Sequence, residues 1–164
     1  MRPASVTASE DQEAAAFVAW FRTAYPSLAG CLIHVKNETP KPGKERGGAF
    51  AGLIAKQKRM GTLKGTPDYF LSIGTDEMHG LFIEMKKEGG SVKPEQVAFL
   101  QGAAERGYGA VVAWGWSAAA HATARYLKGT LPPYVLGVPY DGEPVALGVL
   151  TLTGKVRGKA PTQG

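Results

Sequence analysis

Asp68, Glu84 and Lys86 combine two carboxylates with an amine within a short stretch of the chain. Glu84 and Lys86 lie in the apolar run 81–86, and alternate residues of a strand share a face, so these two side chains are neighbours. Asp68 begins the preceding apolar run, directly after Pro67. If the two runs pair as a hairpin, Asp68 comes close to Glu84.

Two carboxylates beside a lysine suit a hard divalent cation, which takes oxygen ligands from carboxylates, water and phosphate. Such an ion polarises a phosphoryl group and lowers the pKa of a bound water. Lys86 is placed to orient that water or to offset negative charge on the phosphate. The alternative is an exposed Glu84–Lys86 ion pair with Asp68 in a turn. The Pro-Asp entry upstream and the helix start downstream favour the metal site.

The composition bounds the class of protein. The 164 residues, 44% of them hydrophobic, suit one folded domain and exclude wholesale disorder. A single cysteine, Cys31, excludes an intramolecular disulfide and a cysteine-based zinc site. The longest apolar stretch, 110–120, falls short of the ~20 residues of a membrane span, and no export signal precedes it. We therefore expect a protein of the cytoplasm with no membrane partner.

Positive charge is concentrated in one segment. The net charge is +5, and the segment 36–64 holds eight basic and two acidic residues, which leaves the rest of the chain close to neutral. This pattern is typical of a polyanion partner such as nucleic acid. The alternative is a loop kept soluble by its lysines.

Apolar periodicity predicts alternating helices and strands. We expect an arm over 1–8, a nuclease-like domain over 9–130, and a C-terminal extension over 131–164 with an edge strand at 145–152 and a mobile basic tail. Helices are predicted at 9–25, from 50 to a stop at Gly61, at 94–106 and at 117–127, with Ser117 capping the last. Strands are predicted at 31–36, 69–73, 81–86 and 110–114. This order favours an α/β fold with a mixed central sheet flanked by helices.

The order and spacing of several short motifs resemble a known family. Asp68 and Glu84-x-Lys86 resemble the PD-(D/E)xK nuclease signature, and the longer pattern is similar to its VRR-NUC branch, especially small stand-alone phage-type members. The stretches that carry this resemblance are 34–38 (HVKNE), 64–68 (KGTPD), 82–86 (FIEMK), 89–90 (GG), 94–96 (PEQ) and 107–108 (GY). The resemblance covers about residues 9–128.

The resemblance implies a restriction-endonuclease-like core that hydrolyses DNA phosphodiesters with Mg²⁺ or Mn²⁺. Asp68 and Glu84 would be metal ligands together with the carbonyl of Met85. Lys86 would be the catalytic lysine. Two further polar residues would complete the catalytic set, Glu13 as the family's N-terminal glutamate and Gln96 as its glutamine, which holds the water or a phosphate.

Several of these residues also have a simpler interpretation. Glu13 could complement the positive end of its own helix, and Gln96 could cap the helix that Pro94 begins. Lys93 stands where relatives often carry Ser or Thr, which costs an N-cap worth ~1 kcal/mol and adds a phosphate contact. Trp114 and Trp116 are expected in the core and at its rim rather than as base-stacking groups.

The function that we expect is that of a metal-dependent DNA endonuclease, structure-selective on branched DNA such as four-way junctions. It would act as a homodimer, phage-encoded or in a bacterial host, and the absence of a P-loop argues against a nucleotide cofactor. One alternative is a non-catalytic nucleic-acid-binding module that keeps the fold; another is a metal-free hydrolase that uses the two carboxylates on a small substrate. Residues expected to contact nucleic acid are His34, Asn37, Lys41, Lys44, Arg46, Lys58, Lys64 and Lys93.

Overall fold

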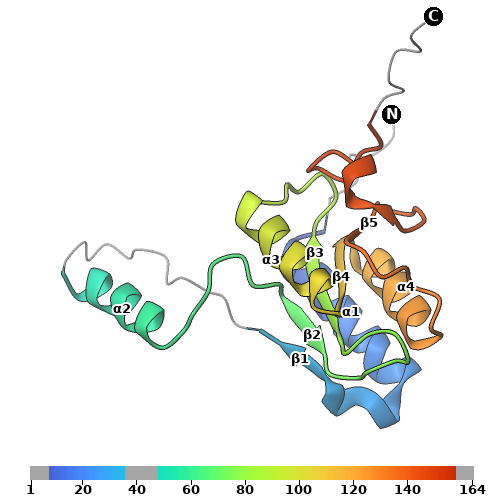
Figure 1. The fold of residues 1–164 in the computed structure, drawn as a ribbon, viewed down its shortest axis with the longest axis horizontal. Helices are drawn as coiled ribbons and strands as arrows, with labels where there is room; N and C mark the ends of the chain where they lie inside the picture. Colours follow the sequence, from blue (N-terminus) through green and yellow to red (C-terminus); the bar gives the residue numbers. More distant parts are fainter. Residues whose placement is uncertain (1–7, 36–47, 158–164) are drawn as a thin grey trace, which may run out of the picture.

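The computed structural model describes residues 8–35 and 48–157, which form a six-stranded mixed sheet (Figure 1). Strand order follows chain order from β1 to β6. Neighbours pair antiparallel from β1 to β3, parallel from β3 to β5, and antiparallel again at β6. The strands are β1 (Leu32–His34), β2 (Tyr69–Leu71), β3 (Leu81–Lys86), β4 (Gly109–Trp114), β5 (Leu136–Val138) and β6 (Val145–Ala146). The predicted α/β fold with a mixed sheet is confirmed.

Three helices cover the sheet. The helices α1 (Glu10–Ala24) and α4 (Trp116–Leu127) pack on one face, and α3 (Pro94–Glu105) packs on the other. The first core holds Phe17 and Phe21 of α1 against Ile83 of β3. The second holds Leu100 of α3 against Val112 and Trp114 of β4. Both faces of the central strands are therefore buried.

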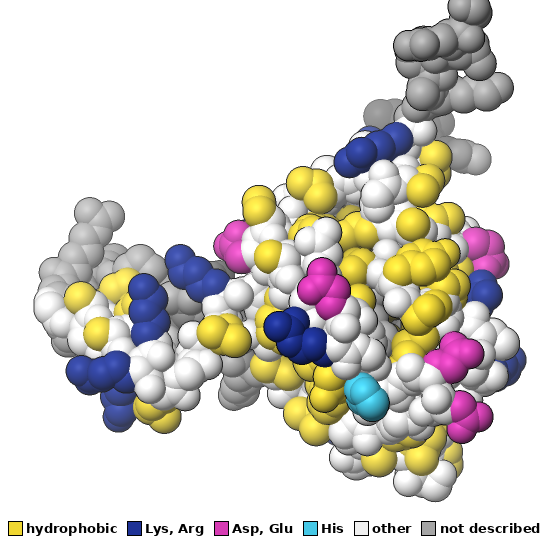
Figure 2. Space-filling view, viewed as in Figure 1, with side chains coloured by type: hydrophobic (Ala, Val, Ile, Leu, Met, Phe, Trp, Pro, Cys, Tyr) yellow, Lys and Arg dark blue, Asp and Glu magenta, His cyan; other side chains and the backbone are white. Residues whose placement is uncertain are grey.

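The helix α2 (Gly48–Arg59) projects away from this body (Figure 1). Its last turn carries Lys56, Lys58 and Arg59, and Figure 2 shows basic side chains gathered over it. Leu53 in the helix and Met60 and Leu63 just after it are exposed. We call α2 with the following residues, up to Lys64, the α2 arm.

One expectation from the sequence is corrected, and two elements that it did not predict are present. The strand β5 was not predicted, because its three residues include a glycine and are followed by Pro139. The edge strand predicted over 145–152 is confined to Val145–Ala146, after which the chain turns into a short 3-10 helix, Leu147–Val149. A second 3-10 helix, Pro26–Cys31, follows α1.

The helix α4 begins at Trp116, one residue before the predicted cap Ser117. Its N-cap residue is Gly115, with a φ of +92°, a conformation that glycine adopts without steric cost. Ser117 is therefore not the cap.

One edge of the sheet collects the ends of several strands. Because β1, β3, β4 and β5 point the same way and β2 runs opposite, the carboxyl ends of those four strands meet the start of β2. We call this the carboxyl edge. In open α/β sheets ligands bind outside this edge. Within the described ranges, no helix has the length and apolar character needed to cross a membrane.

Candidate active site

Asp68 lies at the start of β2, where the two predicted strands pair. The register sets Tyr69 opposite Ile83, so Asp68 comes opposite Glu84 at the carboxyl edge. The Oδ2 atom of Asp68 accepts a hydrogen bond from the backbone N–H of Met85 at 2.8 Å. The carbonyl of Asp68 accepts a second bond from the N–H of Val35, also at 2.8 Å, which ties the end of β1 to the same point. The expected pairing of Asp68 with Glu84 is thus confirmed.

Glu84 is the most deeply buried of the candidate residues, with 1% of its surface exposed. Its Oε1 atom lies 2.7 Å from the Nζ atom of Lys86 and accepts a hydrogen bond from the Nε2 atom of Gln96. Its Oε2 atom is also buried, and it has no hydrogen-bond partner within the part of the chain that the structure describes. One carboxylate oxygen is therefore bound by two side chains, and the other is buried without a hydrogen-bond partner among the described residues.

Burial dominates the electrostatics of the two carboxylates. It raises the pKa of Glu84 to about 7, helped by the charge of Asp68 and opposed by the hydrogen bond and charge of Lys86. Burial also raises the pKa of Asp68, and the bond from the Met85 N–H is the main opposing effect. Both carboxyls therefore lose their protons less readily than exposed ones, and a positive charge between them would favour the ionised forms.

Gln96 caps its helix, as one of its two interpretations predicted, and it also contacts Glu84. Its Oε1 atom accepts a hydrogen bond from the N–H of Lys93 at 2.9 Å, which caps the start of α3, while its Nε2 atom donates to Glu84. The amide therefore links the first turn of α3 to the carboxylate on β3. As expected, the Lys93 side chain makes no cap hydrogen bond.

Glu13 is buried, as its inward position predicted, but it is turned toward another helix. Its Oε2 atom accepts a hydrogen bond from the N–H of Trp116 at 2.6 Å, so this carboxylate caps the start of α4. The cavity lined by Asp68, Glu84 and Lys86 has Glu10 in its wall instead. Glu10 was missed because it occupies the first turn of α1, where acidic residues are common for helix stability alone.

The same cavity receives His34 from the end of β1. The His34 side chain is exposed, and its ring lies 5.2 Å from that of Tyr69, measured between centroids. It therefore combines a packing contact with a position beside Asp68. Asn37, Lys41, Lys44 and Arg46, which the sequence grouped with His34, lie outside the described residues.

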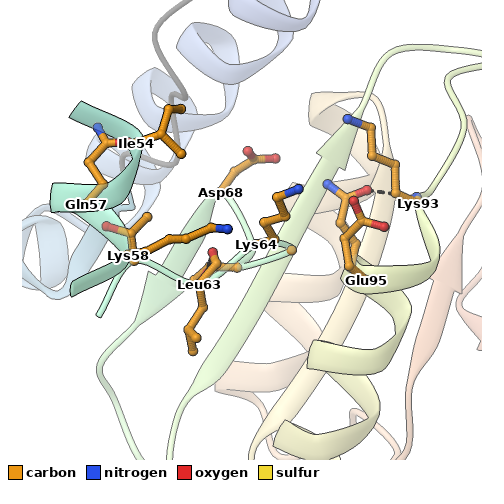
Figure 3. Close-up of a pocket in the computed structure, with 12 residues that line it drawn as sticks. Ile54, Gln57, Lys58, Leu63, Lys64, Asp68, Lys93 and Glu95 are labelled. Carbon is orange, nitrogen blue, oxygen red and sulfur yellow. Dashed lines mark hydrogen bonds between the residues drawn. The ribbon is translucent and has the colours of Figure 1, made fainter. Parts of the chain in front are cut away.

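A cleft between the α2 arm and the body adjoins this cavity, and we call it the α2 cleft. Asp68 and Gln96 line both hollows, so the two are continuous. Lys58 from α2 and Lys64 from the following loop extend into it near Asp68, with Lys93 on the far side (Figure 3). Within residues 8–35 and 48–157, these three lysines form no ion pair.

Gly65 allows the loop between α2 and β2 to pack closely against the start of α3. A Cβ atom at this position would lie 2.4 Å from the carbonyl oxygen of Glu95 and 2.9 Å from the backbone nitrogen of Gln96. The φ of Gly65 is +82°, which also favours glycine. The loop that leads to Asp68 is therefore pressed against the helix that carries Gln96.

The donor set fits a metal ion that keeps part of its water shell. Among the described residues no three His, Cys, Asp or Glu side chains gather into a ready-made cage. Mg²⁺ commonly binds through one or two carboxylates and completes its shell with water and phosphate oxygens. The open Oε2 atom of Glu84 beside Asp68 meets that requirement.

Comparison with known proteins agrees with this geometry. The model of the VRR-NUC domain matches residues 8–115. A solved structure described as "VRR_NUC domain protein" superimposes with a TM-score of 0.62 at 28% identity, covering 74% of this chain and 90% of that one. Among curated proteins none matches the chain. With the fold, the motif order and the family model in agreement, the chain belongs to the VRR-NUC domain family of nuclease-fold proteins.

Proposed function

We propose that this protein is a metal-dependent DNA endonuclease. The observation that carries the proposal is the Glu84 carboxylate, which is buried opposite Asp68 with one oxygen bound by Lys86 and Gln96 and the other open. A buried charge is costly unless it is fully paired, and an unpaired buried oxygen in a folded protein calls for an explanation. A cation bound at that oxygen supplies one.

Asp68, Glu84 and the carbonyl of Met85 are the proposed ligands of Mg²⁺ or Mn²⁺. When bound, the ion adds positive charge at the scissile phosphate and makes a water molecule more acidic. The Lys86 amine, 2.7 Å from Glu84, is the group proposed to orient the attacking water and to offset negative charge that develops on the phosphate. Gln96 fixes the Glu84 carboxylate, and its amide is the proposed contact for the water or a phosphate oxygen.

The two glutamates of α1 take different proposed roles. Glu10 faces the cavity and is the proposed third acidic group beside the substrate. Glu13 acts at a distance, because it holds the start of α4, and Gly115 directly before that helix donates to the carbonyl of Lys86 at 2.8 Å. Glu13 would therefore keep the end of β3 in place rather than touch the reacting atoms.

The α2 cleft is the proposed path of the DNA backbone toward Asp68. Lys58, Lys64 and Lys93 offer three cations around it, and His34 lines the adjoining cavity. Phosphate contacts of this kind supply most of the sequence-independent affinity for DNA. The cations at Lys41, Lys44 and Arg46, together with Asn37, are proposed to extend the same contact surface.

Branched DNA such as a four-way junction is the proposed substrate, cut by two copies of the chain. Cutting two strands of a junction needs two active sites, and the exposed apolar side chains of Leu53, Met60 and Leu63 on the α2 arm provide a surface for a second copy. The proposed place of action is the cytoplasm of a bacterial or phage-infected cell.

A cleavage assay on labelled duplex, flap and four-way-junction DNA tests the proposal. We expect cleavage with Mg²⁺ or Mn²⁺, none with EDTA, and a loss of about 10²–10⁴-fold in rate for Lys86→Ala. Lys87→Ala is the matched control, because it removes the same charge from the adjacent exposed position. Tight binding without cleavage of any DNA would instead support a non-catalytic module, and cleavage that persists in EDTA would exclude the metal.

A further inference from the structure

Two equally exposed tyrosines flank β5, one at each end of the strand. Tyr134 precedes β5 with 50% of its surface exposed, and Tyr140 follows it with 46%. Because β5 runs parallel to β4 and β3, Tyr140 lies at the carboxyl edge, with the candidate active site, and Tyr134 lies toward the opposite edge. Only Tyr140 therefore lies at the same edge of the sheet as the candidate active site.

The ring of Tyr140 lies against the end of β4. A Cβ atom on Gly115 would come within 2.8 Å of two of its ring carbons and within 3.6 Å of the Oε2 atom of Glu13. Gly115 in turn donates to the carbonyl of Lys86 at 2.8 Å. Lys86 and Trp114 are the last paired residues of β3 and β4, and Gly115 is the next residue. The Tyr140 ring packs against Gly115, which leaves room for it because glycine has no side chain.

A tight turn presents this ring to solvent. The N–H of Gly142 donates to the carbonyl of Pro139 at 3.0 Å and closes the turn around Tyr140 and Asp141. Asp141 has a φ of +53°, the one positive value at a non-glycine residue in the described part of the chain. Such a conformation costs about 1 kcal/mol or more and persists where the surroundings hold it. The turn therefore sets the backbone position of Tyr140, and its side chain is still half exposed.

Negatively charged side chains surround Tyr140, and they determine which type of ligand can bind next to its ring. The charge of Asp141 is the largest cause that raises the pKa of the Tyr140 phenol, followed by burial and by the charges of Glu13 and Glu88. These carboxylates disfavour direct contact of a phosphate with the ring itself, whereas the three lysines of the α2 cleft offer cations for the phosphates that flank a base. A flat, uncharged ligand fits this place better than an anion.

We propose that Tyr140 is a stacking platform for an unpaired nucleobase next to the scissile phosphate. The proposal rests on the proposed nuclease function and adds a reason for substrate choice. Two strand spacings, about 10 Å, separate β5 from β3, and Tyr140 follows the end of β5 at the same edge of the sheet at which β3 ends with Lys86. A base within a continuous duplex is already stacked on both faces, so the platform favours DNA with an unpaired nucleotide at the branch.

The test is equilibrium binding of the full-length Lys86→Ala protein, with Ca²⁺ present, to fluorescently labelled forked DNA. One series carries a single abasic site at each position around the branch. We expect one position at which loss of the base weakens binding about 5- to 100-fold, since base–aromatic stacking is of that strength. Adding Tyr140→Ala should weaken binding of intact DNA by the same factor and abolish the difference between intact and abasic DNA.

Two variants separate stacking from a structural effect. Tyr140→Phe keeps the ring and should keep the sensitivity to the abasic position. Tyr134→Ala removes an equally exposed tyrosine at the other end of β5 and should leave binding unchanged. Thermal melting of each variant checks that the fold is intact.

The possible failures are distinguishable. If DNA binds but no abasic position matters, or if Tyr140→Ala keeps the discrimination, the platform is wrong and the nuclease proposal stands. If the wild-type chain neither binds nor cleaves any of the DNA forms, both proposals fail together.

Discussion

The carboxyl edge at β2 and β3 and the α2 arm differ in how their charged groups are held. At the edge, Glu84 and Lys86 are buried and joined to each other, to Asp68 through the backbone of Met85, and to Gln96. On the arm, Lys58 and Lys64 are exposed and form no ion pair among the described residues. The charged side chains at the edge are therefore held in fixed positions by the core, whereas those on the arm can change position to meet a ligand.

The largest effect expected at the buried site, after loss of activity, is a dependence of stability on pH. In metal-free protein the pKa of Glu84 is raised from 4.5 to about 7, so the folded state keeps a proton that the unfolded state loses. The free energy of unfolding should therefore fall as pH rises from about 4.5 to about 7, by a total on the order of 3 kcal/mol.

Urea denaturation in EDTA at pH 5 and pH 8 measures this difference. Glu84→Gln, which cannot titrate, should remove most of it. Mg²⁺ at pH 8 should restore stability to the wild type. Equal stability of the wild type at both pH values would show that neighbouring groups stabilise the ionised Glu84 carboxylate enough to offset its burial. The pKa of Glu84 would then be close to that of an exposed glutamate, and the edge and the arm would differ less.

A pair of glycine substitutions gives the next largest effect. Gly65→Ala places a methyl group 2.4 Å from the Glu95 carbonyl at a positive φ, and should destabilise the protein by about 2–3 kcal/mol. Gly52→Ala in the middle of α2 meets no atom within 4 Å and should be neutral or stabilise the helix by up to about 1 kcal/mol. Thermal melting of both variants compares the close-packed loop with the projecting arm.

The smallest effect concerns the lysines of the α2 cleft. Lys58→Ala combined with Lys64→Ala should weaken binding of all DNA forms alike and reduce the slope of log K against log salt by about 1 per lysine. Lys56→Ala with Arg59→Ala removes the same charge from the arm but outside the cleft, and should change the slope less. Titrations at several salt concentrations measure both slopes. Identical slopes for the two pairs would mean that the cleft is not the DNA path.

The sequence predicted the core of the site because local spacing determines it. The alternation of Glu84 and Lys86 and the Pro-Asp start of β2 follow from strand geometry, and the register between Tyr69 and Ile83 then brings Asp68 into place. The capping role of Gln96 also followed from its position three residues after Lys93. These features depend on residues close together in the chain or on one pairing of strands.

Other features of the fold depend on contacts between residues far apart in the chain, which the spacing of residues in the sequence does not reveal. The bond from Trp116 to Glu13 joins residues 103 positions apart, so the sequence could show that Glu13 points inward but not what it meets. The spacing also did not show what covers the face of β3 that carries Phe82, which packs against a cluster that holds Leu100 of α3 and Leu147. The strand β5 is too short and too rich in glycine for its apolar pattern to show.

The match between strand order and chain order has a consequence for how the molecule is made. Each strand from β1 to β6 joins an edge that already exists, and none has to be inserted between two others. A chain released from the ribosome N-terminus first can therefore bring Asp68 and Glu84 together before β5 and β6 have emerged. The turn that carries Tyr140 is added last, at the growing side of the sheet. Changes there can alter which DNA is held during evolution while the earlier-formed carboxylate pair stays as it is.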